Sequence, residues 1–373
     1  MSDDELVAWL RLLATPSVGR DTARRLLAAF GGPAQALAAD ETARRRVAGA
    51  AVAAALNRPP EGFEAQCQAT QAWRRAAGAA APRRLMVLGD ADYPEAWLNT
   101  ADPPLLLYLE GRAELLRSAR TLAIVGSRKP TPQGRDNARQ FAATLAQQGW
   151  VIVSGLAAGI DGAAHEGALQ AGGDTVAVIG TGIDIAYPAS HRGLARRIAE
   201  HGLLVSELPL GAPPLAAHFP QRNRLIAGLA RGTLVVEAAL RSGSLITARL
   251  AAEAGREVYA LPGSVLSAQS EGCHELIRQG ATLVGSAAQL LQELDGLPAW
   301  PEGAAPGPAL PLDSAEATDP VLRALGLDPC SLDALMARCG WPAPQLSAHL
   351  LTLELSGQIA RLPGGLFQRI HSG

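Results

Sequence analysis

Two runs of small and basic residues follow apolar segments of this 373-residue chain, and their types and spacing suit anion binding. The runs are Gly126-Ser127-Arg128-Lys129 and Arg241-Ser242-Gly243-Ser244. Where a parallel strand turns into a helix, the helix start presents free N–H groups and the positive end of its dipole. Arginine adds planar donors that match phosphate oxygens. The runs therefore predict a phosphate site, and we favour Arg128 most for this role.

Aromatic side chains stand near arginines in two further segments. These segments carry Tyr187 with Arg192, and Phe219 with Arg222, Asn223 and Arg224. A ring that can stack on a base, beside arginines that bind phosphates, is typical of single-stranded nucleic-acid sites. Arginine-bearing helices are more often only solvated faces, however. Alternatively, Arg222 and Arg224 pair with Glu207 or Glu237 to hold the sheet edge. For these two arginines, nucleic-acid binding and ion pairing both stay open here.

The segment SGLAAGIDGAAHEGAL combines glycines with two titratable residues. Gly155 and Gly159 permit close backbone approach. Asp161 and His165 are four residues apart, hence on one helix face, and could form half of a metal or acid–base site. No third ligand is evident, so we favour a structural role in which Asp161 caps the helix and His165 packs against the loop.

Several chemistries are excluded by what the chain lacks. Lys129 is the only lysine and lies between Arg128 and Pro130, so no nucleotide-triphosphate loop ending in Gly-Lys-Ser/Thr is present. No G-x-G-x-x-G fingerprint occurs, and the four cysteines form no C-x-x-C pair. No motif joins a nucleophile to a base. We therefore expect a non-catalytic binding protein that needs neither cofactor nor metal.

Alternating apolar runs and helical spacers must position these residues. The runs cover 85–88, 105–109, 122–126, 151–155, 176–180, 203–207, 233–238, 257–263 and 281–284. Those from Leu122 onward do not alternate in polarity, as expected for strands buried on both faces. The spacers are long enough for crossover helices. The prediction is an α/β fold with a Rossmann-like, doubly wound, mostly parallel sheet over residues 81–296.

Smaller modules flank the predicted sheet. Residues 1–80 read as helical, and Val18-Gly19 resembles the hairpin of a helix-hairpin-helix, whose amides can contact DNA phosphates. Residues 297–318 form a Pro/Ala/Gly-rich linker, and 319–373 have the helix and strand pattern of a winged helix. The predicted recognition helix offers only Gln345 and His349 to bases, and residues 296–373 carry a net charge of −3 (4 basic, 7 acidic). Protein docking is therefore favoured for this module.

The ordered motifs of residues 85–295 resemble those of the DNA-processing protein A family, known as DprA or Smf. The motifs are IVGSR, SGLAxGID, GTGID…YP, FPQRNRLIAG, VVEA, RSGSLITA and LPGS, and the flanking modules fit the layout of the family. Two positions depart from the pattern, because His191 and His274 stand where asparagine is usual. Arg192 stands where a lysine is frequent, which preserves the charge.

This resemblance implies a single-stranded DNA-binding recombination mediator that protects incoming DNA and loads a RecA-type recombinase during natural transformation. It implies a cytoplasmic homodimer that associates through the Rossmann-like domain, with residues 276–284 as a candidate contact. By this resemblance, Arg128, Arg192, Arg222 and Arg224 line a pocket for phosphate and base. The N-terminus lacks a basic start followed by an apolar stretch, so we expect no signal peptide, and no apolar run reaches the ~20 residues of a membrane helix.

Two other function classes stay open at this point. Related Rossmann-like folds hydrolyse nucleotide N-glycosidic bonds, and here Glu237 would act with Arg222 or Arg224 on a nucleoside phosphate. The chain has AALRSGSLITA where such enzymes usually carry PGG-x-GT-x-x-E. A transcription regulator that uses the winged helix is the other class, and the poor recognition helix counts against it.

Overall fold

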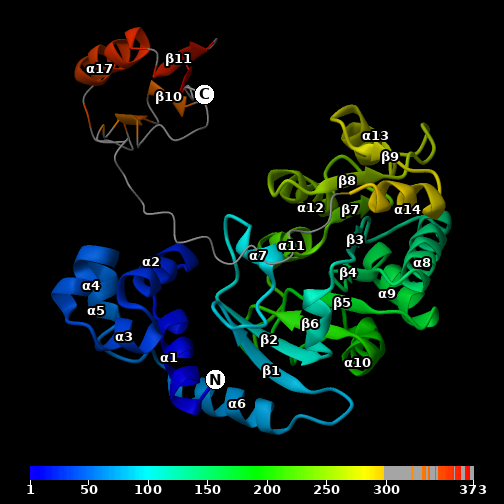
Figure 1. Ribbon diagram of the computed structural model, residues 1–373, viewed down its shortest axis with the longest axis horizontal. Coiled ribbons are helices and arrows are strands. Elements are labelled where there is room, and N and C mark those ends of the chain that lie inside the picture. The colour runs from blue at the N-terminus through cyan, green and yellow to red at the C-terminus, as the bar shows by residue number, and fades with distance from the viewer. Residues whose placement is uncertain are drawn as a thin grey trace. The chain divides into compact units, whose positions relative to one another are not determined.

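A computed structural model describes residues 1–297 and parts of the C-terminal region (Figure 1). The described C-terminal residues are 319, 321–322, 330–332, 335–336, 341, 343–356, 358–362 and 366–369. The chain forms two compact units, Met1–Pro298 and Ala299–Gly373. From residue 298 on, the predicted linker lies outside the described residues.

A nine-stranded sheet forms the centre of the first unit. Its strands are β1 (Arg83–Val87), β2 (Leu106–Gly111), β3 (Thr121–Val125), β4 (Val151–Ser154), β5 (Thr175–Val178), β6 (Leu203–Ser206), β7 (Gly232–Val235), β8 (Glu257–Ala260) and β9 (Thr282–Leu283). Their spatial order is β1-β2-β6-β5-β4-β3-β7-β8-β9. The strands from β3 to β9 pair in parallel, whereas β1 with β2 and β2 with β6 pair antiparallel. The predicted doubly wound, mostly parallel sheet is confirmed.

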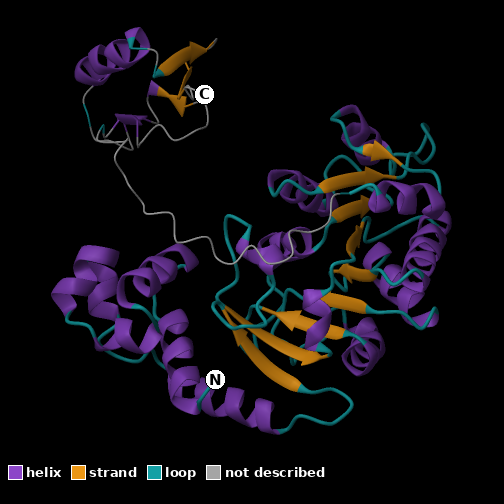
Figure 2. Ribbon diagram, viewed as in Figure 1, coloured by secondary structure: helices purple, strands orange, loops and turns teal. Residues whose placement is uncertain are grey.

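Helices cover both faces of the sheet (Figure 2). The crossover and peripheral helices are α7 (Glu95–Leu98), α8 (Pro132–Gln147), α9 (Ile160–Gln170), α10 (Arg192–His201), α11 (His218–Leu229), α12 (Gly243–Glu253), α13 (Glu271–Arg278) and α14 (Ala287–Asp295). In Figure 1, α8, α9 and α10 lie on one face, and α11 and α12 lie on the other. Leu122 and Ile124 of β3 are fully buried in the core between these layers.

The N-terminal part of the first unit is helical, as predicted. Its helices are α1 (Asp3–Ala14), α2 (Arg20–Phe30), α3 (Pro33–Ala38), α4 (Glu41–Ala48), α5 (Ala50–Ala55) and α6 (Phe63–Arg75). Ser2 caps α1 by accepting a hydrogen bond from the Glu5 N–H at 3.1 Å, and Asp40 caps α4 in the same way. Leu6, Leu12 and Leu26 are fully buried and form part of its core.

The second unit has winged-helix elements, which confirms that prediction. Helix α17 (Ala343–Leu355) precedes the antiparallel pair β11 (Ile359–Leu362) and β12 (Leu366–Arg369). A short strand β10 (Cys330–Ser331), which the sequence pattern did not indicate, pairs with β12. Leu346 and Leu350 of α17 are buried. Among the residues that the structure describes in both units, no helix has the length and apolarity needed to cross a membrane.

Candidate functional site

A cavity of about 690 Å³ opens at the carboxyl ends of the central strands. Strand β3 is flanked by β4 on one side and by β7 on the other, so the chain changes direction across the sheet there. In open α/β sheets, ligands bind in the crevice at this switch point. The cavity brings together most residues predicted for a phosphate site: Gly126, Ser127, Arg128, Lys129, Tyr187, Phe219, Arg222, Asn223, Arg241, Ser242, Gly243 and Ser244.

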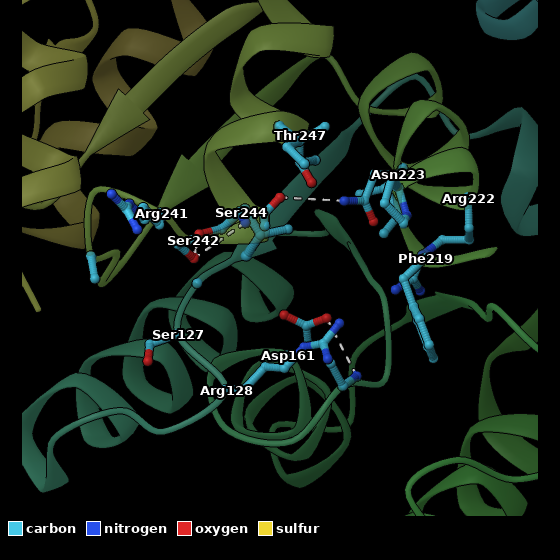
Figure 3. Close-up of a pocket in the computed structure, with 18 of the residues that line it drawn as sticks. Ser127, Arg128, Asp161, Phe219, Arg222, Asn223, Arg241, Ser242, Ser244 and Thr247 are labelled. Atoms are coloured by element: carbon cyan, nitrogen blue, oxygen red, sulfur yellow. Dashed lines mark hydrogen bonds between the residues drawn. The ribbon is translucent and has the colours of Figure 1, made fainter. Parts of the chain in front are cut away.

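Three groups of side chains surround this space (Figure 3). Ser127 and Arg128 belong to the loop after β3, and Phe219 and its neighbours belong to the first turns of α11. The third group, Arg241 with the serines that follow it, leads into α12. Each group thus comes from a strand end or a helix start, the places where ligands of open α/β sheets bind.

A cationic and aromatic face lies at one wall of the cavity. The Arg128 guanidinium carbon is 5.1 Å from the centroid of the Phe219 ring, and the Tyr187 ring is 5.6 Å from Phe219 at an interplanar angle of 42°. Arg128 is exposed, and Tyr187 is 44% exposed. The three side chains therefore present stacking surface and positive charge together, a combination that suits a nucleobase and its phosphate.

The start of α12 forms the wall that can hold an anion. Ser242 is the N-cap and accepts a hydrogen bond from the Ser244 N–H at 3.3 Å. The Ser242 and Ser244 hydroxyls are 2.6 Å apart, and the Asn223 amide donates to the Gly243 carbonyl at 3.4 Å. Arg241 is exposed just before the helix. Two hydroxyls, a helix start and an exposed guanidinium thus line the cavity together.

Arg222 lines the cavity but is tied into the fold. The residue is only 7% exposed, and Nη1 donates to the Gly155 carbonyl at 2.7 Å and to the Val178 carbonyl. Burial lowers the pKa of the guanidinium to about 10, Asp161 opposes this shift, and Arg128 adds to it. Arg222 thus joins the ends of β4 and β5 and adds positive charge beneath the cavity.

Gly155 and Gly159 shape the site without lining the main cavity. A Cβ on Gly155 would lie 2.4 Å from both terminal nitrogens of Arg222, so only glycine fits beside that guanidinium. Gly159 has φ +87°, and a Cβ there would lie 2.3 Å from the Ser127 carbonyl oxygen. Gly155 also borders a side pocket of about 70 Å³ that shares Arg128, Tyr187 and Phe219 with the main cavity.

Two predicted arginines are not brought to the cavity. Arg224 pairs with Glu207, and its Nε lies 3.1 Å from Asp102 Oδ2, so the ion-pair alternative describes this residue. Arg192 is exposed at the start of α10 and is not among the residues that line the cavity. Of the four arginines expected to share one pocket, the structure places Arg128 and Arg222 at the cavity and Arg192 and Arg224 away from it.

Glu237 holds the start of α8 and does not face the cavity. Its carboxylate accepts hydrogen bonds from the Thr131 N–H at 2.9 Å and from the Thr131 hydroxyl, while Thr131 itself caps α8. A Cβ on Gly134 would collide with the same carboxylate, which shows how tightly it is enclosed. Both carboxylate oxygens thus accept hydrogen bonds from the N-cap residue of α8. Glu237 is therefore not placed to act on a ligand in the cavity.

Asp161 and His165 have separate structural roles. Asp161 Oδ2 accepts hydrogen bonds from the Gly155 and Ala157 N–H groups at 3.1 and 3.4 Å, so it holds the preceding loop. The expected helix cap is wrong in detail, since Gly159 is the N-cap of α9. Burial raises the pKa of Asp161, while Arg222 opposes that shift. Within the described part of the chain, no group of three or more His, Cys, Asp or Glu residues could hold a metal ion.

His165 is buried in its neutral form. Thr175 Oγ1 donates to the Ile152 carbonyl at 2.7 Å, so it accepts from His165 Nδ1–H, also at 2.7 Å. His165 Nε2 is buried and has no hydrogen-bond partner among the residues that the structure describes. Burial lowers the pKa of His165 to about 3, helped by His191 and Arg222. A proton on Nε2 would create a buried charge with no acceptor.

We expect stability to fall as the pH drops below about 6.5, since unfolding frees His165 to bind a proton that the folded state refuses until about pH 3. Thermal unfolding of wild type and His165→Asn between pH 7.5 and 4.5 measures this. Asn can still donate to Thr175 but does not titrate. A flatter pH dependence is expected for His165→Asn, and identical slopes would contradict a neutral buried histidine.

Sequence reasoning missed part of the cavity wall. The missed lining residues include Ala157, Pro214, Ala216, Ile226, Ile246 and Gln269. Ser127 Oγ donates to Gln269 Oε1 at 3.2 Å, which ties the loop after β8 to the loop after β3. The LPGS motif at the end of β8 was a usable signal for this loop, because strand ends of one parallel sheet share an edge.

Comparisons with known protein families cover most of the chain. The model described as DNA recombination-mediator protein A matches residues 84–295. The DprA-like N-terminal HHH domain matches residues 3–57, and the DprA winged helix domain matches residues 304–365. Three models thus match in the order that the family layout requires.

Individual relatives agree with these matches. Protein Smf of Escherichia coli is 46% identical over 295 residues, which cover 76% of this chain and 77% of that protein. DNA processing protein DprA of Streptococcus pneumoniae is 48% identical over 206 residues, 55% of this chain and 72% of that protein.

Solved structures show the same fold. The X-ray structure of DprA from Streptococcus pneumoniae superposes with a TM-score of 0.66 at 36% identity and covers 79% of this chain and 98% of that chain. DNA processing protein A of Helicobacter pylori, studied for its single-stranded DNA binding mode, gives a TM-score of 0.51 at 33% identity. The superposition covers 57% of this chain and 95% of that chain. The chain therefore belongs to the DNA recombination-mediator protein A family.

Proposed function

We propose that this protein is a single-stranded DNA-binding recombination mediator that holds DNA in the cavity at the switch point. The observation that carries the proposal is the stack of Arg128, Phe219 and Tyr187 beside the start of α12. A base would stack on the rings, and its phosphate would meet Arg128 and the positive end of the α12 dipole. The Helicobacter pylori relative, whose structure concerns single-stranded DNA binding, supports this choice.

The contacts offered by the cavity favour binding without sequence preference. Every base has a face that can stack, and every nucleotide has a phosphate. A duplex would have to unstack to bring a base onto Phe219, which costs free energy. Single strands should therefore bind more tightly than duplexes of the same length.

The cavity offers little support for catalysis. Among its described lining residues, Asp161 is the one carboxylate, and it is buried and hydrogen-bonded to backbone N–H groups. The hydrolase alternative relied on Glu237, whose oxygens are used at the start of α8. A non-catalytic role fits this arrangement better than N-glycosidic cleavage.

Fluorescence anisotropy of a labelled oligothymidylate, with a matched duplex as competitor, tests the proposal. We expect the single strand to bind, the duplex to compete poorly, and the affinity to fall steeply as salt rises. Equal affinity for the duplex would overturn the preference for single strands. Release of free base from nucleoside monophosphates would favour the hydrolase alternative instead.

The proposal extends to partners. As a family member, the chain would protect single strands and load a RecA-type recombinase during natural transformation in the cytoplasm, as a homodimer formed through the Rossmann-like domain. Strand β9 is at the edge of the sheet, and its Leu283 is 53% exposed within the predicted contact 276–284. An unpaired edge with exposed apolar side chains suits self-association. Sizing chromatography with light scattering tests the dimer.

A further inference from the structure

Helix α11 serves two regions of the first unit. Its first turns carry Phe219, Arg222 and Asn223, which line the cavity. Arg224, next along the helix, points into a separate cluster, where it donates to Glu207 Oε1 at 2.5 Å and to the Asp102 carbonyl at 2.8 Å. A shift of α11 would therefore move the cavity wall and the cluster together.

The same cluster holds the N-terminal helices. Arg20 Nε lies 2.7 Å from Asp102 Oδ2, and Arg24 Nη1 lies 2.5 Å from Asp102 Oδ1, so α2 and α11 share one carboxylate. Arg20 also lies 4.0 Å from Glu207. Burial would raise the pKa of Asp102, but Arg224, Arg24 and Arg20 hold it below its usual value. The exposed fractions of Asp102 and Arg224 are 29% and 13%, so water screens these pairs only in part.

The hairpin between α1 and α2 also faces α11. A second cavity, of about 310 Å³, is lined by Val18 and Gly19 of the hairpin, by Arg20 at the start of α2, and by His218, Gln221 and Arg222 of α11. Arg222 thus borders both this cavity and the candidate DNA site. The hairpin whose amides the sequence suggested for DNA phosphates thus borders the helix that builds the site, and its contact with DNA stays a prediction.

We propose that the N-terminal helical region is a positioning element for the DNA cavity, and that Asp102 is the positioning residue that links α2 to α11. This inference rests on the proposed function, because it concerns how the same cavity is held. Trp97 Nε1 donates to the Leu225 carbonyl at 3.0 Å and lies against Gly228, one turn on from Arg224, so it holds the same side of α11. Arg222 ties α11 to the Gly155 and Val178 carbonyls, and the ion-pair cluster adds the contact through which α2 bears on the same helix.

Two variants with opposite charge changes test the proposal in the full-length protein. Arg20→Gln/Arg24→Gln removes two positive charges from α2, and Asp102→Asn removes one negative charge from the cluster. If only net charge mattered, the first would weaken DNA binding and the second would strengthen it. We expect both to weaken oligothymidylate binding by about 3- to 10-fold, the size typical of coupling through a packed network.

Matched controls separate positioning from charge. Arg45→Gln/Arg46→Gln removes two exposed positive charges from α4, and Asp92→Asn removes a surface carboxylate that pairs with Arg84. Neither should change the affinity by more than about 2-fold. Asp102→Glu, which keeps the charge, should recover affinity relative to Asp102→Asn.

A stacking signal tests the geometry directly. An oligonucleotide with 2-aminopurine, whose fluorescence is quenched on stacking, should be quenched by wild type and less by Asp102→Asn at saturation. If a variant is less stable to heat but keeps its affinity and its quenching, the cluster only stabilises the fold. That result would overturn the positioning role. If wild type itself fails to bind the strand, the proposed function fails and the coupling is not at issue. Tighter binding by Asp102→Asn would also overturn the proposal.

Discussion

Replacing Arg128 by alanine should lower the affinity for single-stranded DNA by about 10- to 100-fold, the cost of one charge-assisted contact. The exposed guanidinium is available to a phosphate, and it also lies 5.1 Å from the centroid of Phe219, where it adds charge to the stacking surface. The free energy of unfolding should change by no more than about 0.5 kcal/mol, because the side chain is exposed. Anisotropy titrations and thermal unfolding measure the two effects.

The salt dependence of binding separates a phosphate contact from a general charge effect. Losing one phosphate contact to a single strand should reduce the slope of log affinity against log salt by ~0.7. Arg249→Ala is the matched control, since Arg249 is 70% exposed on α12 beside Glu253 and does not line the cavity. An equal loss of affinity in both variants would place the phosphate site elsewhere.

The sheet could be predicted from the sequence because each buried parallel strand carries a continuous apolar run. The run at 122–126 became β3, and the run at 151–155 became β4. The antiparallel direction of β1 and β2 was harder to foresee, because an apolar run has the same composition in either direction. Strand β10 is only two residues long, too short for any periodicity.

The site was predictable where function depends on a strand end and less so where it depends on side-chain direction. Gly126–Lys129 and Arg241–Ser244 follow strands of one parallel sheet, so they had to meet at one edge. Arg222 and Arg224 are two residues apart on α11, so their side chains leave the helix in nearly opposite directions, about 160° apart. One lines the cavity and the other forms ion pairs, and only the neighbours in space decide which.

Because Arg222 is buried and hydrogen-bonded, its replacement should have the other large effect, a loss of stability. Replacing Arg222 by methionine should lower the free energy of unfolding by about 3 kcal/mol, because the carbonyls of Gly155 and Val178 lose a charged donor inside the protein. Asp161 also loses the positive charge that offsets its burial. Methionine fills a similar volume, so lost polar contacts and not a void would dominate. Urea unfolding measures the change.

A substitution on the other side of the same contact provides the check. Gly155→Ala places a Cβ 2.4 Å from the guanidinium nitrogens and should expel Arg222 without altering its charge. Both variants should therefore lose stability, and combining them should cost less than the sum of the two, because they remove the same contact. Additive losses would show that Gly155 and Arg222 act separately. An unfolding free energy unchanged in Arg222→Met, with DNA affinity lost, would instead make Arg222 a ligand contact like Arg128.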